Sequence, residues 1–482
     1  APSMDACQSV GRVSASYASN IKKVFAVLFL SVATREISFG TLFDAYLLDL
    51  GGSSGNVLVG SVESIRGMIQ LLLAWPLGLL ADRMPRVRLC RYNLFFLTAG
   101  FALLISGVLL DNISLIYLGM AVWAPSFQCW FTSSSAIVAD SCPPETRTTT
   151  IANMSNVQLI GSSLGPLIQL CCLFYLGTDH WETSTLHHVI GIGCIIFPFV
   201  VGGTLTLAEL EPLEKTSAKG RSRFETVDLE RPLLKVPARW FLAIGLQIAT
   251  TITAMGAGMT VKFFPLFFKT EYGFEPRDLC MMTFAYPLAM ALMQRVCLRV
   301  AAHLGRLQAI MLFHILGTAC LFWLSVAKSV YLALPLYFIR GALMNARQPI
   351  LAAVTMDLVT TEMRGRWSSI QSIASFSWSG SAFVGGWVAQ SAGYRASFAV
   401  TAAVYTFSAL VYIPFMLVFP DEREKKILQQ KYSHVPSHQT FMTPVTPCGV
   451  LNDSQLQTFG DIDLVGLDDD DNQVTKRDSS AR

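Results

Sequence analysis

The stretch Gly78-Leu-Leu-Ala-Asp82-Arg83-Met-Pro-Arg86 lies between two long apolar runs and decides how the rest of the chain is interpreted. The residues just before it carry no charge, whereas an aspartate and a cluster of arginines, extending to Arg91, follow at once. An apolar helix that ends in basic residues is typical of a helix that leaves a membrane on its cytoplasmic side. The stretch therefore predicts a membrane protein whose chain is cytoplasmic at this point.

The composition agrees with a membrane location. Of the 482 residues, 52% are hydrophobic and only 14% are charged, whereas a soluble globular chain has about 25% charged residues. A soluble fold cannot bury so much apolar surface, so lipid must surround much of the chain. The net charge of +3 is too small to indicate a nucleic-acid partner. The 11 cysteines include no C-x-x-C pair, and we expect them to pack as small apolar side chains.

Twelve apolar runs have lengths near that of one bilayer crossing, which takes about 20 residues. The runs do not alternate between polar and apolar residues, as the strands of a membrane barrel would. They span residues 24–48, 56–80, 92–110, 114–139, 150–176, 187–208, 239–268, 278–298, 307–327, 330–357, 367–391 and 396–420. The expected fold class is an all-α membrane protein with twelve transmembrane helices.

The basic residues of the loops predict the orientation of the chain. If the N-terminus is cytoplasmic, the outer loops hold only Lys269, Arg277, Lys328 and Arg395, and the other loop lysines and arginines lie on the inner side. This asymmetry places both termini in the cytoplasm. The predicted parts are an N-terminal cytoplasmic tail (1–23), two six-helix bundles (24–208 and 239–420), a polar linker between them (209–238) and a disordered cytoplasmic tail (421–482).

The same spacing of charges recurs in the two halves. The first copy comprises Asp140, Glu145 and Arg147 after the fourth run, and the second comprises Asp357, Glu362 and Arg364 after the tenth. A repeat at matching positions indicates that the two halves arose by duplication.

These motifs resemble those of the major facilitator superfamily. The stretch 78–86 is similar to the family signature G-x-L-A-D-R-x-G-R-[KR], although Pro85 stands where the family usually has glycine. The repeated acid-and-arginine motif and the turn at residues 385–398 also look like those of the family, so the resemblance covers about residues 24–420. It implies a secondary transporter built from two six-helix halves.

The resemblance also implies a role for the charged loops. Asp82, Arg83 and Arg86 would form a latch that closes the cytoplasmic side in one state of the transport cycle, and Asp140, Glu145, Arg147, Asp357, Glu362 and Arg364 would act similarly. The alternative is that these charges only signal topology. The counterpart of the latch in the second half, Ala302–Arg306, lacks an acid at the position of Asp82, so any latch would be stronger in the first half.

Charged residues inside the apolar runs are the best sequence pointers to function, because each costs about 2.5 kcal/mol or more near the bilayer centre. The candidates for substrate binding or coupling are Arg35, Glu36, Asp44, Glu63, Arg66, Arg340 and Arg347. In the family fold, helices one, four, seven and ten line the central cavity. Arg35 and Glu36 are adjacent and point in different directions, so at most one of them can face that cavity squarely.

Two interpretations of these charges remain open. A carboxylic acid buried away from water, such as Glu36 or Asp44, can carry a proton near neutral pH, and a buried arginine can hold an anion through two hydrogen bonds. Alternatively, Glu36 and Glu63 neutralise Arg35 and Arg66 as structural pairs. Arg340 has no acid within one turn of its own helix, which favours contact with a substrate over the alternative, pairing with an acid from another helix.

The sequence thus predicts a secondary active transporter for a small organic solute, with a preference for anions and possible proton coupling. The alternatives are a facilitative uniporter, a drug/proton antiporter, and a sensor or scaffold of the same fold that does not transport. The fourth run lacks the early arginine common in drug antiporters, and Gln169 and Leu170 stand where their fifth-helix motif has glycines. No ATP-binding loop, zinc motif or catalytic constellation is evident. We therefore expect no enzyme activity, cofactor or metal; the expected partners are a small-molecule substrate, protons and the lipid bilayer, and the chain is expected to be monomeric.

Overall fold

The computed structural model describes residues 4–142, 144–177, 180–210, 232–233, 236–359 and 364–418. These residues belong to one compact unit that ends at Lys425. The expected tail 421–482 and most of the expected linker 209–238 lie outside these ranges. We call residues 4–210 the first half and residues 236–418 the second half.

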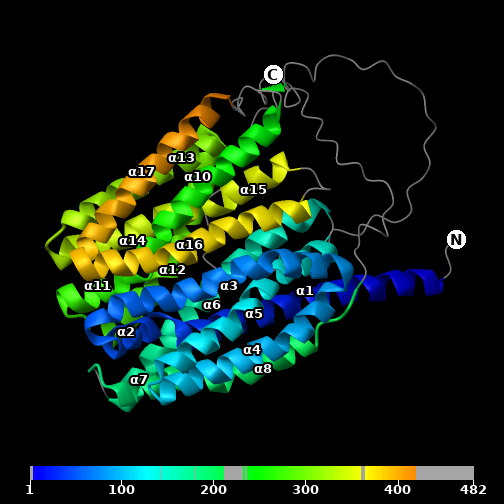
Figure 1. The fold of residues 1–482 in the computed structure, drawn as a ribbon. Coiled ribbons are helices and arrows are strands. Elements are labelled where there is room, and N and C mark those ends of the chain that lie inside the picture. Colours follow the sequence, from blue (N-terminus) through cyan, green and yellow to red (C-terminus); the bar gives the residue numbers. More distant parts are fainter. Residues whose placement is uncertain are drawn as a thin grey trace, which may run out of the picture. The chain divides into compact units, whose positions relative to one another are not determined.

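Helices form nearly all of the described chain and group into twelve segments (Figure 1). The first half contains α1 (Met4–Phe39) with α2 (Thr41–Leu50), α3 (Gly55–Arg83), α4 (Arg86–Leu109), α5 (Ile113–Ser141), α6 (Pro144–Leu176), and α7 (Thr183–Gly191) with α8 (Gly193–Leu205). The second half contains α10 (Ala238–Thr260) with α11 (Phe263–Tyr272), α12 (Pro276–Leu304), α13 (Arg306–Val326), α14 (Val330–Ala346) with α15 (Gln348–Leu358), α16 (Arg364–Ala392) and α17 (Tyr394–Val418). A 3-10 turn (Gly52–Ser54) and two antiparallel strands, β1 (Pro232–Leu233) and β2 (Val236–Pro237), complete the list.

Each segment coincides with one predicted apolar run, which confirms the prediction of an all-α membrane protein. Within the described ranges, eight helices are long and apolar enough to cross a membrane, as judged by length and composition, and Ile113–Phe127 is a shorter apolar helix. The largest difference in boundaries concerns α1, which begins at Met4 rather than at residue 24. Its candidate membrane span begins at Ser16.

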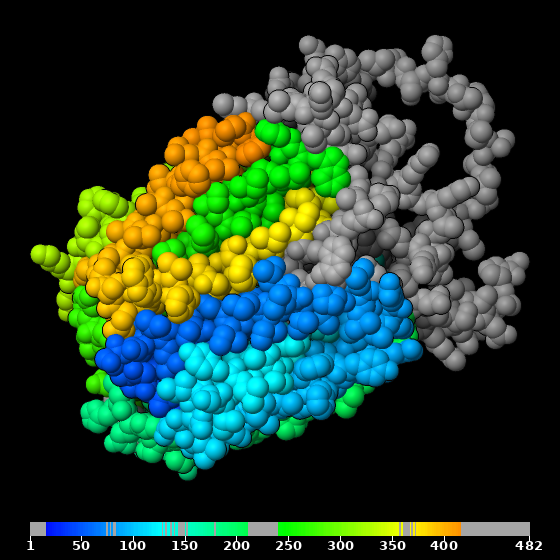
Figure 2. Space-filling model, in the orientation of Figure 1, coloured from blue at the N-terminus to red at the C-terminus, as the bar shows by residue number. Residues whose placement is uncertain are grey.

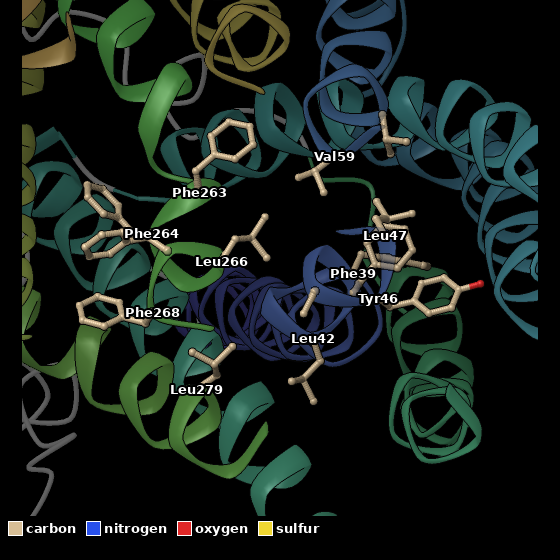
Figure 3. Packing of buried hydrophobic residues seen from close by; sticks show 14 of the residues in the cluster. Phe39, Leu42, Tyr46, Leu47, Val59, Phe263, Phe264, Leu266, Phe268 and Leu279 are labelled. Carbon is tan, nitrogen blue, oxygen red and sulfur yellow. The ribbon is translucent and has the colours of Figure 1, made fainter. Parts of the chain in front are cut away.

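The buried apolar residues that the structure describes form three clusters. The largest contains residues of both halves, including Phe39, Leu42 and Val59 from the first and Phe263 and Leu279 from the second (Figure 3). These residues lie near the loops that are predicted to face outward. The other two clusters lie near the loops predicted to be cytoplasmic, and each belongs to a single half. The described halves therefore share one apolar core only at the predicted outer end.

Glycines allow α3 and α16 to pack closely along one another (Figures 1 and 2). A Cβ atom added at Gly60 would overlap the carbonyl oxygen of Ala382, and one at Gly67 would overlap the side chain of Ser379. Small residues are the usual means by which membrane helices approach closely. This contact brings the polar groups of the two helices together in the interior.

The helix α16 also packs closely on α10, and a test of this second contact uses two helical glycines in different surroundings. A Cβ atom at Gly258 of α10 would overlap the carbonyl oxygen of Trp378 in α16, whereas one at Gly202 of α8 would meet no atom within 4 Å. We expect Gly258→Ala to destabilise the protein by about 1–3 kcal/mol, because the backbone must move to admit the methyl group. Gly202→Ala should be neutral or slightly stabilising. The measurement is the melting temperature of each purified variant. Equal melting temperatures would contradict the close packing of α10 against α16.

Candidate functional site

Two helices that correspond in position in the two halves are interrupted. The first segment breaks at Gly40, where a Cβ atom would overlap the carbonyl oxygen of Glu36, and the seventh breaks between α10 and α11. Asp44 lies in the first turn after the first break, and Lys262 lies at the second, directly before α11. Interrupted helices at matching positions are where membrane transporters commonly build their binding sites.

Lys262 connects the two halves. Its ammonium group donates to both carboxylate oxygens of Asp44, each at 3.1 Å, and lies 3.9 Å from a carboxylate oxygen of Glu63 in α3. Asp44 is only 6% and Glu63 only 5% exposed. In such surroundings the mutual attraction of opposite charges 4 Å apart reaches about 4 kcal/mol. This contact therefore holds the two halves together in the described state.

Arg66 and Ser379 extend the same network. Arg66 forms an ion pair with Glu63, one turn away on α3, and donates to the Ser379 hydroxyl of α16 at 3.3 Å. That hydroxyl in turn donates to Glu63 at 3.2 Å. The Arg66 guanidinium also lies 4.9 Å from the ring centre of Phe127 and 5.7 Å from that of Trp378, distances at which a cation is attracted to an aromatic face.

The network is electrically balanced. Its two acids, Asp44 and Glu63, face two bases, Arg66 and Lys262. Burial of charges is costly, and a buried pair is tolerated only when its members neutralise each other. Separation of the halves at this point would require water or a proton to replace the lost partner.

Arg35 and Glu36 form a second, local pair. Their side chains contact each other, and each also meets a different helix. Arg35 lies 5.8 Å from the ring centre of Phe127 in α5, whereas Glu36 packs against α6, where Gln169 donates to the carbonyl oxygens of Glu36 and Ile37. The charge of Arg35 is therefore already compensated within the first half.

Arg340 in α14 is fully buried and surrounded by aromatic groups. It donates to the Tyr405 hydroxyl at 2.8 Å, and its guanidinium lies 4.8 Å from the ring centre of Phe264. Tyr286 and Tyr337 are further neighbours. Within the described ranges, no acidic side chain pairs with Arg340, and its Nε atom has no hydrogen-bond partner.

Arg347 lies at the break between α14 and α15 and is also buried. It donates to the carbonyl oxygen of Met344 at 3.3 Å, and its Nη1 atom has no hydrogen-bond partner among the described residues. His314 of α13 is an electrostatic neighbour. The interior of the described second half thus contains two arginines without an acidic partner.

The predicted latch is described only in part. Arg86 forms an ion pair with Asp140, which joins the start of α4 to the end of α5 within the first half. Arg83 is exposed at the end of α3. The other residues predicted for the latch lie outside the part of the chain whose side chains the structure describes: Asp82, Glu145, Arg147, Asp357, Glu362 and Arg364.

Further contacts join the halves at the predicted outer end. Lys269 of α11 pairs with Asp49 of α2 at 2.6 Å and lies 3.9 Å from the ring centre of Trp181. The Trp181 indole donates to the carbonyl oxygen of Phe274 at 3.2 Å, and Tyr394 donates to Asn56 at 2.8 Å. Together with the shared apolar cluster, these contacts join the described halves at the predicted outer end.

Lys262 is the principal residue that the sequence analysis missed. No candidate residue was named inside the run 239–268. A signal was present, because the apolar residues Phe263–Phe268 follow the lysine and place it well inside the run. Ser379 was missed because one serine in a serine-rich helix carries no signal of its own.

No group of at least 3 His, Cys, Asp or Glu side chains in the described chain is arranged to hold a metal ion.

A family profile described as Major Facilitator Superfamily matches residues 24–383 and, in a second match, residues 248–447. Comparison with curated proteins gives no match. Similar solved structures include a D-xylose–proton symporter (TM-score 0.62, 11% identity, covering 85% of this chain and 98% of that chain). The human organic anion transporter TETRAN has a TM-score of 0.59 and 17% identity, over 81% of this chain and 99% of that one. A bacterial homologue of the iron transporter ferroportin, in an inward-facing state, has a TM-score of 0.60 and 12% identity, over 83% and 98%. At these identities the likeness concerns the fold.

Proposed function

Since the chain belongs to the Major Facilitator Superfamily, we propose that it is a secondary transporter that moves a small organic anion across a membrane by alternating access of two six-helix halves. Membership of this family makes it an integral, multi-pass membrane protein and points to a transporter rather than an enzyme. We expect the two six-helix bundles to span residues 24–208 and 239–420, and the basic loops favour both termini in the cytoplasm.

The contact of Lys262 with Asp44 carries the proposal of a moving gate. In alternating access, a contact between the halves that exists in one state must break in another. The 3.1 Å contacts of Lys262 lie beside the shared core of the closed outer end, so opening on that side would separate Lys262 from Asp44. The ion pair is thus a lock that the transport cycle must release.

Protonation of Asp44 is the proposed means of release. A proton on Asp44 would remove the negative charge that holds Lys262 and would lower the cost of separating the halves. Asp44 is better suited to this role than Glu36, because Glu36 contacts Arg35 within its own half and does not bridge to the second half. Proton binding and opening of the outer end would then be coupled.

The unpaired arginines support an anionic substrate. Arg340 and Arg347 are each 1% exposed, and no acid pairs with either in the described chain. An uncompensated guanidinium in a membrane interior is unfavourable, and a bound anion would relieve this cost. An arginine fork also matches the geometry of a carboxylate or phosphate.

Uptake by proteoliposomes tests these proposals. The purified protein is supplied with labelled organic anions, cations and sugars, with and without a pH gradient. We expect uptake of an anion that a pH gradient accelerates, and we expect Asp44→Asn to abolish this acceleration, because the variant cannot gain or lose a proton there. The matched control is Asp49→Asn, since Asp49 also pairs with a lysine across the halves but is largely exposed; it should retain the response.

The other outcomes identify the alternatives. Uptake by the wild type that ignores the pH gradient would indicate a uniporter or another coupling ion. Preferential flux of cations or sugars would contradict the anionic substrate. No flux of any solute from folded protein would favour a sensor or scaffold of the same fold.

A further inference from the structure

A cavity of about 90 Å³ lies inside the first half, among α1, α4, α5 and α8. Its walls are mainly apolar and include six aromatic side chains: Phe39, Phe101, Trp123, Phe127, Trp130 and Phe197. It is partly open, so an occupant can extend beyond this volume. None of the charged residues of the network between the halves lines it, although the ring of Phe127 lies between the cavity and Arg66.

Two polar groups that line the cavity have no hydrogen-bond partner in the described structure. The Ser126 hydroxyl and the Trp130 indole nitrogen are buried, and neither has a hydrogen-bond partner in the described structure. Ser126 is 2% exposed. An indole N–H can only donate, and a buried donor without an acceptor is unfavourable. Asn93, which also lines the cavity, uses its amide to donate to the Ser126 carbonyl oxygen at 3.3 Å, so it does not satisfy either group.

Arg35 also lines the cavity and is a further hydrogen-bond donor, but it adds little net positive charge there because it pairs with Glu36. Its Nε and Nη2 atoms both donate to one carboxylate oxygen of Glu36, and Glu36 itself does not line the cavity. A ligand that carries a negative charge would therefore approach an acid that already neutralises Arg35. A neutral acceptor would avoid this repulsion.

From this geometry we infer that the cavity binds a small, uncharged aromatic molecule that carries a hydrogen-bond acceptor, such as an aromatic carbonyl compound. The ring would pack between the aromatic side chains, and the acceptor would engage Ser126 and Trp130. A cavity of roughly 150 Å³ with apolar walls accommodates benzene, so one ring that projects from the open side is the appropriate size. The inference goes beyond the proposed transport function and does not depend on it.

The test measures equilibrium binding of radiolabelled benzamide to the full-length protein in lipid nanodiscs, with empty nanodiscs subtracted. Toluene has the ring without the acceptor, and benzylamine has a cationic donor in its place. We expect saturable binding of benzamide that unlabelled benzamide displaces at least tenfold more effectively than either analogue. Absence of saturable binding, or equal displacement by toluene, would overturn the inference.

Variants locate the binding. Leu97 lines the cavity, and Leu97→Phe should fill it and weaken benzamide binding at least tenfold. Leu118→Phe is the matched control, because Leu118 is 50% exposed on α5 and does not line the cavity; it should bind like the wild type. Unchanged binding in Leu97→Phe would contradict the proposed location.

Two further variants test the chemistry without filling the cavity. Trp130→Phe keeps a ring and removes the N–H group, so it should reduce the preference for benzamide over toluene. Glu36→Gln leaves Arg35 without its acid, and binding of benzoate should then strengthen at least fivefold relative to benzamide. If neither preference changes, the donors and the charge balance do not select the ligand, and the inference fails.

Discussion

Replacement of Lys262 by glutamine is expected to abolish solute accumulation and to lower the melting temperature of the purified protein. Lys262 holds Asp44 at 3.1 Å and lies 3.9 Å from Glu63, so its loss leaves two buried acids with Arg66 as their only base in the network. Removal of one partner from a buried ion pair costs about 3–5 kcal/mol, a large part of the 5–15 kcal/mol that typically separates folded from unfolded protein. Melting temperature and gradient-driven uptake are the two measurements.

A double variant separates loss of the ion pair from general damage. When Lys262→Gln is combined with Asp44→Asn, no unpaired charge remains between the two positions, and an amide can still bond to an amide. We expect the double variant to recover much of the lost melting temperature and to remain unable to accumulate solute. The shortfall from additivity measures the interaction of the pair.

Lys269→Gln is the matched control for this experiment. Lys269 is itself largely buried, but the side chain of its partner Asp49 is 47% exposed, so water screens this pair more than it screens the pair of Lys262 with Asp44. We therefore expect a much smaller change in melting temperature and continued uptake. If Lys262→Gln transports like the wild type, or if the destabilisation by Lys262→Gln and Asp44→Asn is simply additive, the lock does not exist.

The sequence predicts features that depend on neighbouring residues, and it misses features that depend on contacts between residues far apart in the chain. Helix positions follow from local apolar runs, and each predicted run matches a helical segment because one bilayer crossing requires a continuous apolar stretch. The early start of α1 escaped prediction because a helix can continue into polar residues outside the membrane. Only the apolar part of α1 can be recognised as a helix from its amino-acid composition.

Site contacts depend on which helix faces which, and this information is not local. Glu63 and Arg66 are one turn apart, so their pairing was among the alternatives that the sequence allowed. Lys262 and Asp44 are 218 residues apart, and their contact depends on how α11 packs against α2. The break at Gly40 is a further case, since a glycine in an apolar run is compatible with both a continuous helix and a kink.

Substitution of Arg340 by glutamine is expected to have the second largest effect and to act on the substrate rather than on the gate. Arg340 is buried between Phe264 and Tyr405 and has no acidic partner in the described part of the chain. Hydrogen bonds to a charged group contribute about 1.5–3 kcal/mol, so loss of this contact should lower anion affinity by about ten- to a hundredfold. The concentration dependence of anion uptake measures this change.

Two matched variants distinguish a substrate contact from a structural one. Arg340→Lys keeps the positive charge but loses the planar fork, so it should transport with weakened affinity. Tyr405→Phe removes the hydroxyl that accepts from Arg340 at 2.8 Å and leaves the arginine in place, so anion uptake should persist. If Tyr405→Phe is as inactive as Arg340→Gln, Arg340 supports the packing of α14 against α17 and does not bind the anion. Uptake that is lost in both Arg340→Gln and Arg340→Lys but kept in Tyr405→Phe would require contact between the planar guanidinium and the substrate, because Arg340→Lys keeps the positive charge and loses only that shape.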